Sequence, residues 1–394
     1  MGTTSFSTMS RANAIEFDEY QQIAESTDQN RRVGGSGLSF YLLGLFGETG
    51  SLLAELKKKR RDHGAYSDYR AGVLEELGDV LWYLTNASSC AGGTLTSLAK
   101  LRADPAIPEK NIIASIEEGS RQARQSDLSS GEFEAMLIQL GGKVGGILKE
   151  FEDGAFDSDH HLFQQRLAAV FDLLCRSAAV GGVDLHEAAA LNAKKIKDRW
   201  PGQDATPTPL FDEHFDVEER LPREINMSFI EKRVDGKSYV IQKCNGIKIG
   251  DRLTDNMVED DGYRYHDVFH LSYAAVLGWS PVARALLKCK RKSDRIMDEV
   301  QDGARAQIIE EGVSTWVFNY AVEHAFFEGV TAIEYDLLKR IRTLVKGFEV
   351  ERCALWEWEN AILSGFQAFR ELRKNNGGLV RANLASRTLV YEGS

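Results

Sequence analysis

Acids on two apolar helical segments constrain the fold of this chain most strongly. Residues 44–55 carry Glu48 and Glu55, and residues 74–84 carry Glu76 and Asp79. Acids seven positions apart share one face of an α-helix, and so do acids three positions apart. Packing these faces together would bury like charges, which is unfavourable unless a hard cation neutralises them. Carboxylate oxygens are the ligands that Mg²⁺ prefers. The pattern therefore predicts a Mg²⁺ site at these four acids, where Mn²⁺ is the expected substitute. The alternative is that both acidic faces are solvated.

The same segments resemble the MazG-type, all-α nucleoside triphosphate pyrophosphohydrolases. The resemblance begins at residues 17–21, continues through 47–50 and 75–84, and closes at 191–201. It covers roughly the first half of the chain. It implies Mg²⁺-dependent hydrolysis of a ribo- or deoxynucleoside triphosphate to the monophosphate and pyrophosphate.

The chain departs from the family pattern at one position. That pattern is an E-x-x-E helix followed by an E-x-x-D helix. Glu76 and Asp79 match the second helix and Glu48 matches the first acid of the first helix, but Ser51 stands at the second acid. Glu55, one turn further along the same face, is our candidate replacement. Whichever of Glu48 and Glu55 is not a metal ligand is the candidate general base that orients the attacking water.

The candidate substrate-binding residues comprise two amides and three cations: Asn86, Asn192, Lys195, Arg199 and Arg61. The resemblance implies the first four. Asn86 matches an asparagine that the family uses near its substrate, and the next three match a closing N-x-x-K-x-x-x-R segment whose amide and cations face the phosphates. Arg61 belongs to the basic run 57–61 and is added as a candidate for the triphosphate tail.

An internal repeat follows the first acidic hairpin. Residues 139–150 echo 44–55, and residues 163–174 echo the second acidic helix. The second copy has lost the acids, because Lys143, Arg166 and Ala169 stand at the places of Glu48, Glu76 and Asp79; Glu150, opposite Glu55, remains. The alternative is a chance similarity between helical segments.

Two paired helix hairpins form a four-helix core. Related single-copy members of the family complete their site by self-association. A fused second copy would complete one site within a single chain, which leaves a homodimer open. The predicted module spans residues 14–200, with an active copy at 14–100 and a degenerate copy at 130–200.

The remaining segments have distinct expected structures. Residues 1–13 are predicted to be flexible and 201–222 to be a linker. In residues 223–394, short strands at 225–233, 237–244 and 247–249 predict a small β-hairpin element. Helices are expected from Tyr263 to about Lys374, and the tail from Asn375 is expected to be irregular or a short strand. The predicted fold class is mainly α, with a second helical domain in this half.

The second half contains its own candidate site. His266 and His270 are one helical turn apart with Asp267 between them, and Glu310 and Glu311 follow. One interpretation is a buried, hydrogen-bonded histidine pair, and another is a zinc-type hydrolytic site. The interpretation that we favour over zinc is a divergent further copy of the hairpin with a recast metal cluster. The cations Lys288, Lys290, Arg291 and Lys292 are expected to form a solvated face.

Charge and cysteine content exclude some classes of protein. The net charge of −11 argues against a general binder of nucleic-acid polymers. The five cysteines have no paired spacing, which indicates reduced thiols. No apolar run approaches ~18 residues, so no membrane partner is expected and the chain is predicted to be cytoplasmic. Two further functions stay open: a nucleotide-sensing regulator without turnover, supported by Ser51, and a second metal-dependent hydrolase around His266 and His270.

Overall fold

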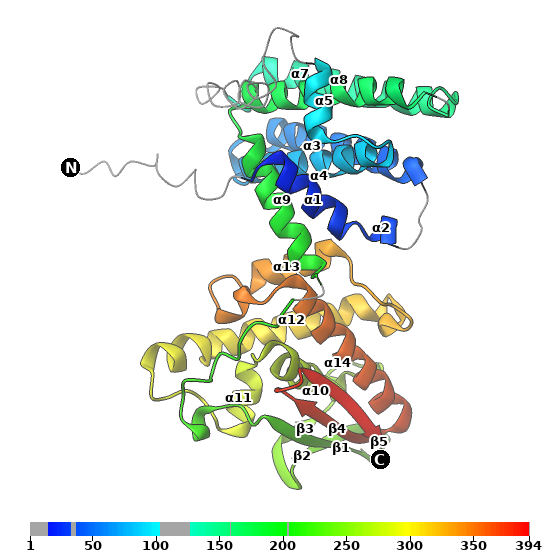
Figure 1. The fold of residues 1–394 in the computed structure, drawn as a ribbon. Helices are drawn as coiled ribbons and strands as arrows, with labels where there is room; N and C mark the ends of the chain where they lie inside the picture. Colours follow the sequence, from blue (N-terminus) through cyan, green and yellow to red (C-terminus); the bar gives the residue numbers. More distant parts are fainter. Residues whose placement is uncertain (1–14, 33–36, 103–126, 158, 203–204, 394) are drawn as a thin grey trace, which may run out of the picture. The chain divides into compact units, whose positions relative to one another are not determined.

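The computed structural model describes residues 15–32, 37–102, 127–157, 159–202 and 205–393 (Figure 1). The N-terminal segment 1–13, predicted to be flexible, lies outside these ranges. The chain divides into two compact units, Met1–Gly202 and Gln203–Ser394. Among the described residues, no helix is long and apolar enough to cross a membrane.

The first unit is helical throughout its described part. Besides a 3₁₀ turn at His63–Ala65, its helices are α1 (Phe17–Thr27), α2 (Gln29–Arg32), α3 (Gly37–Asp62), α4 (Tyr69–Cys90), α5 (Leu95–Arg102), α7 (Gly131–Glu152), α8 (His160–Gly181) and α9 (Leu185–Arg199). Side chains cap several of these helices at their first turn. Ser130 accepts a hydrogen bond from Phe133 N, Asp159 from Leu162 N and Asp184 from His186 N.

Two helix hairpins form the core of this unit. Helix α3 packs on α4 and α7 packs on α8, and the hairpins meet through α3 with α7 and α4 with α8. Helix α9 then packs on α4 and α1. The centre is fully buried and apolar, with Leu45, Leu77 and Leu167 at 0% exposure. The predicted four-helix core is confirmed.

The second unit combines helices with a five-stranded antiparallel sheet in the order β3-β2-β1-β4-β5 (Figure 1). The strands are β1 (Glu224–Val234), β2 (Lys237–Cys244), β3 (Ile247–Leu253), β4 (Gly377–Asn383) and β5 (Thr388–Gly393). The α-helices are α10 (Asp267–Ser272), α11 (Pro281–Leu287), α12 (Ala304–Val322), α13 (Tyr335–Leu344) and α14 (Leu355–Asn375). Short 3₁₀ turns lie at Val217–Glu219, Tyr263–Tyr265, Ala325–Phe327 and Glu349–Arg352, and π-helical turns at Tyr273–Leu277 and Met297–Gln301. The predicted fold class, mainly α with a small β element, is confirmed.

The sheet is larger than the sequence pattern indicates. Its first two hairpin turns have positive φ at Asp235, Gly236, Asn245 and Gly246, as the Asp-Gly and Asn-Gly pairs predict. The tail adds β4 and β5, with Val380 of β4 opposite Met227 of β1. The turn between β4 and β5 has its positive φ at Arg387, a residue type that gives no turn signal.

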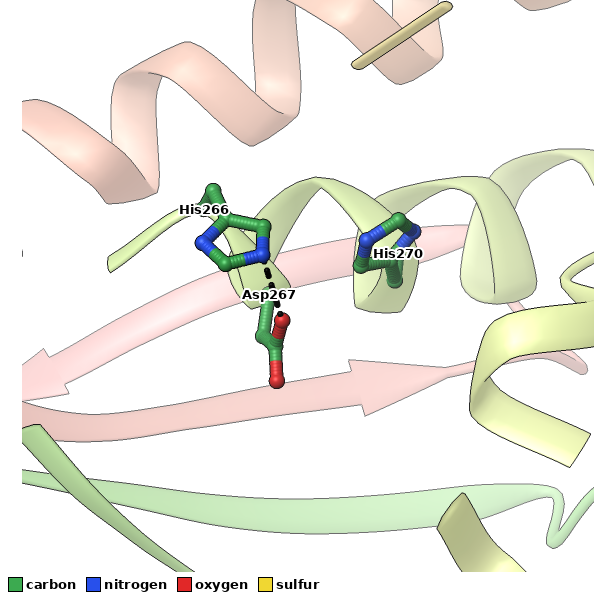
Figure 2. A group of neighbouring side chains, drawn as sticks. All are labelled: His266, Asp267 and His270. Atoms are coloured by element: carbon green, nitrogen blue, oxygen red, sulfur yellow. Dashed lines mark ion pairs between the residues drawn. The ribbon is translucent and has the colours of Figure 1, made fainter. Parts of the chain in front are cut away.

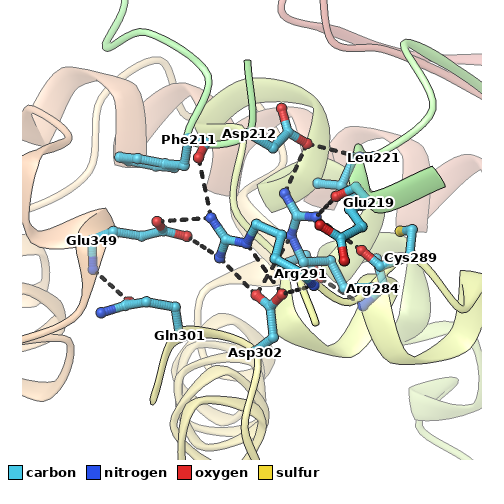
Figure 3. A network of polar contacts seen from close by, with 12 residues as sticks. Phe211, Asp212, Glu219, Leu221, Arg284, Cys289, Arg291, Gln301, Asp302 and Glu349 are labelled. Atoms are coloured by element: carbon cyan, nitrogen blue, oxygen red, sulfur yellow. Dashed lines mark hydrogen bonds and ion pairs between the residues drawn. The ribbon is translucent and has the colours of Figure 1, made fainter. Parts of the chain in front are cut away.

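A buried polar network joins distant segments of the second unit (Figure 3). Arg291 is 0% exposed and donates hydrogen bonds to Asp302 (2.7 Å) and Glu349 (2.6 Å). Arg284, also buried, donates to Asp212 at 2.8 Å. The expectation of a solvated face is therefore wrong for Arg291, because two carboxylates inside the unit compensate its charge.

Part of the predicted linker is folded into the second unit. Phe211, Asp212 and Leu221 lie within 201–222, and each is at most 7% exposed. Asp212 accepts a hydrogen bond from Leu221 N at 2.8 Å as well as from Arg284 (Figure 3). The stretch around these residues therefore belongs to the core of this unit.

Candidate functional site

Three of the four predicted metal ligands lie together in the first unit. Glu48 of α3 and Glu76 and Asp79 of α4 each offer one carboxylate oxygen, and these oxygens lie within 4.8 Å of one another. We call these three residues the acid cluster. All three side chains are partly buried. The packing of α3 on α4 thus brings two acidic helix faces to one point.

Close packing of α3 on α4 fixes the position of the acid cluster. A Cβ atom on Gly44 would lie 2.0 Å from the ring of Tyr83, so this ring packs directly on the backbone of α3. Gly44 precedes Glu48 by four residues and Tyr83 follows Asp79 by four. The contact therefore sets the register of the two helices one turn from the acids.

Helix α9 approaches α4 closely beside Asp79. A Cβ atom on Gly78 would lie 2.8 Å from both the Ala188 carbonyl oxygen and Asn192 Cβ. Because glycine has no Cβ, α9 can lie against α4 here. Asn192 Nδ2 donates to Asp79 Oδ1 at 2.7 Å, and Lys195 Nζ donates to Asp79 Oδ2 at 2.6 Å. Two predicted substrate-binding residues thus contact the acid cluster.

Tyr20 of α1 is a further member of this network that the sequence analysis missed. Its side chain is 0% exposed, and its hydroxyl donates to Asn192 Oδ1 at 2.8 Å. Burial and the nearby charge of Asp79 raise the pKa of Tyr20 well above its usual value. Tyr20 lies in residues 17–21, where the resemblance to the MazG-type enzymes begins. That position was the sequence signal that could have identified it.

Burial and mutual repulsion perturb all three acids. For Glu76, burial and the charges of Asp79 and Glu48 raise the pKa to about 8. Burial and the charge of Asp79 raise the pKa of Glu48. Burial raises the pKa of Asp79, although Lys195 and Asn192 act in the opposite direction. Glu76 therefore holds a proton at neutral pH in the metal-free fold, and a cation bound by the three acids would displace it.

Glu55 is not brought into the acid cluster. Its buried carboxylate accepts hydrogen bonds from Lys58 Nζ at 2.6 Å and from the Tyr66 hydroxyl. A Cβ atom on Gly72 would lie 2.5 Å from Glu55 Oε2, so α4 packs closely on this carboxylate. The physical reason for this difference is that Tyr66, in the connection between α3 and α4, contacts Glu55, which lies two turns after Glu48 on the same face of α3.

The other predicted substrate-binding residues lie at different places in the unit. Asn86 is buried, and its Nδ2 donates to the Trp82 carbonyl oxygen at 3.0 Å, while its Oδ1 has no hydrogen-bond partner among the described residues. The guanidinium of Arg199 lies 4.7 Å from the centre of the Trp200 ring. Arg61 is exposed and pairs with Asp62 at 2.8 Å. The structure joins Asn192 and Lys195, but not Arg61, to the acid cluster.

The second hairpin contains a salt bridge where the first contains acids. Arg166 of α8, at the place of Glu76, pairs with Glu150 of α7 at 2.8 Å. Lys143, at the place of Glu48, is exposed. Within the described part of α7 and α8, no three acids lie close enough together to share a cation.

The second unit contains another group of potential metal ligands (Figure 2). His266, Asp267 and His270 each offer one ligand atom, and these atoms lie within 4.8 Å of one another. All three residues are buried. His270 Nδ1 lies 2.8 Å from Glu310 and His270 Nε2 lies 3.4 Å from Glu311. Burial lowers the pKa of His270, but the charges of Glu310 and Glu311 outweigh it and hold the pKa well above its usual value.

Comparison with known proteins gives a match in the second half of the chain. Residues 206–394 match the model of the MazG C-terminal domain. No curated protein and no solved structure matches the chain. The sequence resemblance lies in the first half and the family match in the second, so the two fall on different units. Interpreting the second half as a divergent copy of the hairpin stays a prediction. The match shows that residues 206–394 are similar to the MazG C-terminal domain.

Proposed function

We propose that this protein hydrolyses a nucleoside triphosphate to the monophosphate and pyrophosphate, and that Glu48, Glu76 and Asp79 bind the required Mg²⁺. One observation carries this proposal: partly buried carboxylates from two helices offer oxygens within 4.8 Å of one another. The match to the MazG C-terminal domain model supports the same type of activity.

The chemistry of the acid cluster fits Mg²⁺. It offers carboxylate oxygens, which suit a hard cation that keeps several of its waters. The raised pKa of all three acids indicates charge that a divalent cation would compensate. When bound, Mg²⁺ would neutralise charge on the phosphate oxygens and lower the pKa of a bound water. Mn²⁺ accepts similar ligands and is expected to substitute.

The surrounding residues hold Asp79 in place for this role. Asn192 and Lys195 each donate to one of its two oxygens, and Tyr20 fixes the amide of Asn192. Lys195 also lies 3.3 Å from Glu75, so it is held between two carboxylates. We assign Lys195 to the phosphates, because it places a cation beside the acid cluster.

Glu55 is a poor candidate for the general base. Both oxygens of Glu55 accept hydrogen bonds from Lys58 and Tyr66. A carboxylate held in this way is poorly placed to take a proton from water. Glu48 belongs to the acid cluster and is assigned to the metal, so neither of these two acids of α3 is left free to act as the general base.

A nucleotide sensor without turnover is the second candidate function. Ser51 favours it, because the first helix has one acid fewer than the family pattern. The full chain is incubated with Mg²⁺ and a panel of ribo- and deoxynucleoside triphosphates, and pyrophosphate and monophosphate are followed. Equimolar release of both products from at least one nucleotide is expected. Nucleotide binding without pyrophosphate release would favour the sensor instead.

A further inference from the structure

His266, Asp267 and His270 of the second unit have contacts of the kind that fix metal ligands in proteins. His266 links the 3₁₀ turn at Tyr263–Tyr265 to α10, and Asp267 and His270 lie within α10. His266 Nε2 lies 3.1 Å from Asp267 Oδ1, and the exposure of the three residues is at most 8%. In Figure 2 the two imidazole rings and the carboxylate lie along one side of this helix. The group belongs to the second unit, whereas the acid cluster belongs to the first.

A fully buried carboxylate anchors His270. Glu310 is 0% exposed and accepts hydrogen bonds from Ser280 Oγ at 2.6 Å and Val282 N at 2.8 Å. Its Oε1 lies 2.8 Å from His270 Nδ1. A histidine that binds a metal through one nitrogen usually donates the other to such a carboxylate, which fixes the tautomer and the ring orientation. Glu310 therefore holds Nδ1 and leaves Nε2, which lies 3.4 Å from Glu311, as the atom that would bind a metal after giving up its proton.

His266 is anchored in a comparable way. Its Nδ1 lies 2.9 Å from the Tyr263 carbonyl oxygen, and its ring stacks on that of Tyr263 with centroids 4.4 Å apart. The backbone acceptor fixes Nδ1 as the protonated nitrogen. Nε2 is then the acceptor nitrogen, and it faces Asp267. Both imidazoles thus use Nδ1 for anchoring and keep Nε2 for a ligand.

We propose that His266 Nε2, His270 Nε2 and the Asp267 carboxylate bind one transition-metal ion of the zinc class, with Glu310 as the positioning residue. Two imidazoles and one carboxylate suit Zn²⁺, whereas Mg²⁺ prefers oxygen ligands throughout. Glu311 lies 3.4 Å from His270 Nε2, and its side chain is 44% exposed. This partly exposed carboxylate therefore lies beside the proposed site.

His324 supplies a matched control for this site. Its ring stacks on Tyr320 with centroids 4.0 Å apart, and its Nδ1 lies 2.6 Å from the Tyr320 carbonyl oxygen. These two contacts are of the same kind as those of His266. His324 is exposed, however, and belongs to no group of potential metal ligands among the described residues. Replacement of His324 removes the same stacking and hydrogen bond without touching the proposed site.

The test measures Zn²⁺ binding to the full chain by competition with a chromophoric chelator, together with the visible absorption of Co²⁺ bound in its place. Wild type, His324→Gln and Glu76→Gln are expected to bind Zn²⁺ with equal affinity, which separates this site from the acid cluster. His266→Gln and Asp267→Asn are expected to lose it. Glu310→Gln is expected to weaken it about 10- to 100-fold, as removal of a supporting carboxylate does.

Two results would overturn the proposal. One is a wild-type chain that does not compete with the chelator, which would make the group an ion-paired histidine cluster without a metal. The other is Zn²⁺ affinity that stays unchanged in both His266→Gln and Asp267→Asn. Circular dichroism of each variant confirms folding, and Asp267→Asn alone decides the question where His266→Gln does not fold.

Discussion

Asn192 of α9 donates a hydrogen bond of 2.7 Å to Asp79 of α4, although 113 positions separate them in the sequence. Asp79 belongs to the copy that retains its acids, and Asn192 lies near the end of the copy that has lost them. Lys195, one turn further along α9, takes the other oxygen of Asp79. The end of the second copy thus positions an acid of the first, as expected where a fused second copy completes the site within a single chain.

The contact of α9 with α4 depends on Gly78. Gly78→Ala would place a Cβ atom 2.8 Å from the Ala188 carbonyl oxygen, so the helices must separate. We expect a loss of about 1–3 kcal/mol in the free energy of unfolding of the first unit. Hydrogen exchange of α4 and α9 during urea unfolding measures this loss.

Gly146→Ala in α7 is the control for this substitution. Nothing lies within 4 Å of a Cβ atom there, so a gain of about 0.5–1 kcal/mol is expected from helix propensity. Equal behaviour of the two variants would contradict the close packing at Gly78.

The raised pKa of Glu76 predicts a pH dependence of Mg²⁺ binding. Its pKa of about 8 in the folded chain exceeds the usual value of 4.5. The metal-free fold therefore binds a proton that the unfolded chain has lost, and this contribution to stability falls as the pH rises from 4.5 to about 8. Mg²⁺ must displace that proton. Its stabilisation of the fold, measured as the shift in Tm, should be larger at about pH 8.5 than at about pH 6. An equal shift at both values would contradict the prediction.

Ser51 offers a gain-of-function test of the metal site. It lies three positions after Glu48 on the same face of α3 and is partly buried. Ser51→Glu would add a fourth carboxylate beside the acid cluster, so Mg²⁺ should bind at least several-fold more tightly in calorimetric titration. Ser51→Gln has nearly the same shape without the charge and should leave the affinity unchanged. Tighter binding in both variants, or in neither, would count against this placement of the metal.

The buried network of the second unit predicts a large loss of stability on removal of one charge. Arg291→Met would leave Asp302, which is 0% exposed, and Glu349 without their shared guanidinium. We expect a cost of about 3–5 kcal/mol in the unfolding of the second unit, measured by urea unfolding. Arg295→Met removes a guanidinium that is 87% exposed and should change little. A small effect of Arg291→Met would mean that water reaches this network.

The sequence predicts the acid cluster because helical spacing is a local property. Glu76 and Asp79 are three positions apart on α4 and therefore share one face. The helix faces around Glu48 and Glu76 are apolar, so the two faces are expected to pack together and to bring the acids close to one another. Glu55 shares the same face, yet its carboxylate pairs with Tyr66 from the following connection. Spacing within one helix carries no information on that contact.

The same limit explains the other differences between prediction and structure. The strands β4 and β5 form because β1 offers an edge to the tail, a partner more than 130 positions away in the sequence. Arg291 looks like part of a solvated basic run until Asp302 and Glu349 are brought to it by folding. In each case the local structure depends on residues that are far away in the sequence. A single sequence does not show which of these residues come into contact.

The most direct test of the proposed activity compares three proteins with one nucleotide that the panel identifies. Pyrophosphate release is measured with and without Mg²⁺ for wild type, Glu76→Gln and Glu150→Gln. Glu150 is the acid that the second copy retains, and it pairs with Arg166 outside the acid cluster. The account predicts Mg²⁺-dependent release in wild type and Glu150→Gln, and at least a hundredfold loss in Glu76→Gln. Undiminished release in Glu76→Gln, or release without a divalent cation, would contradict it.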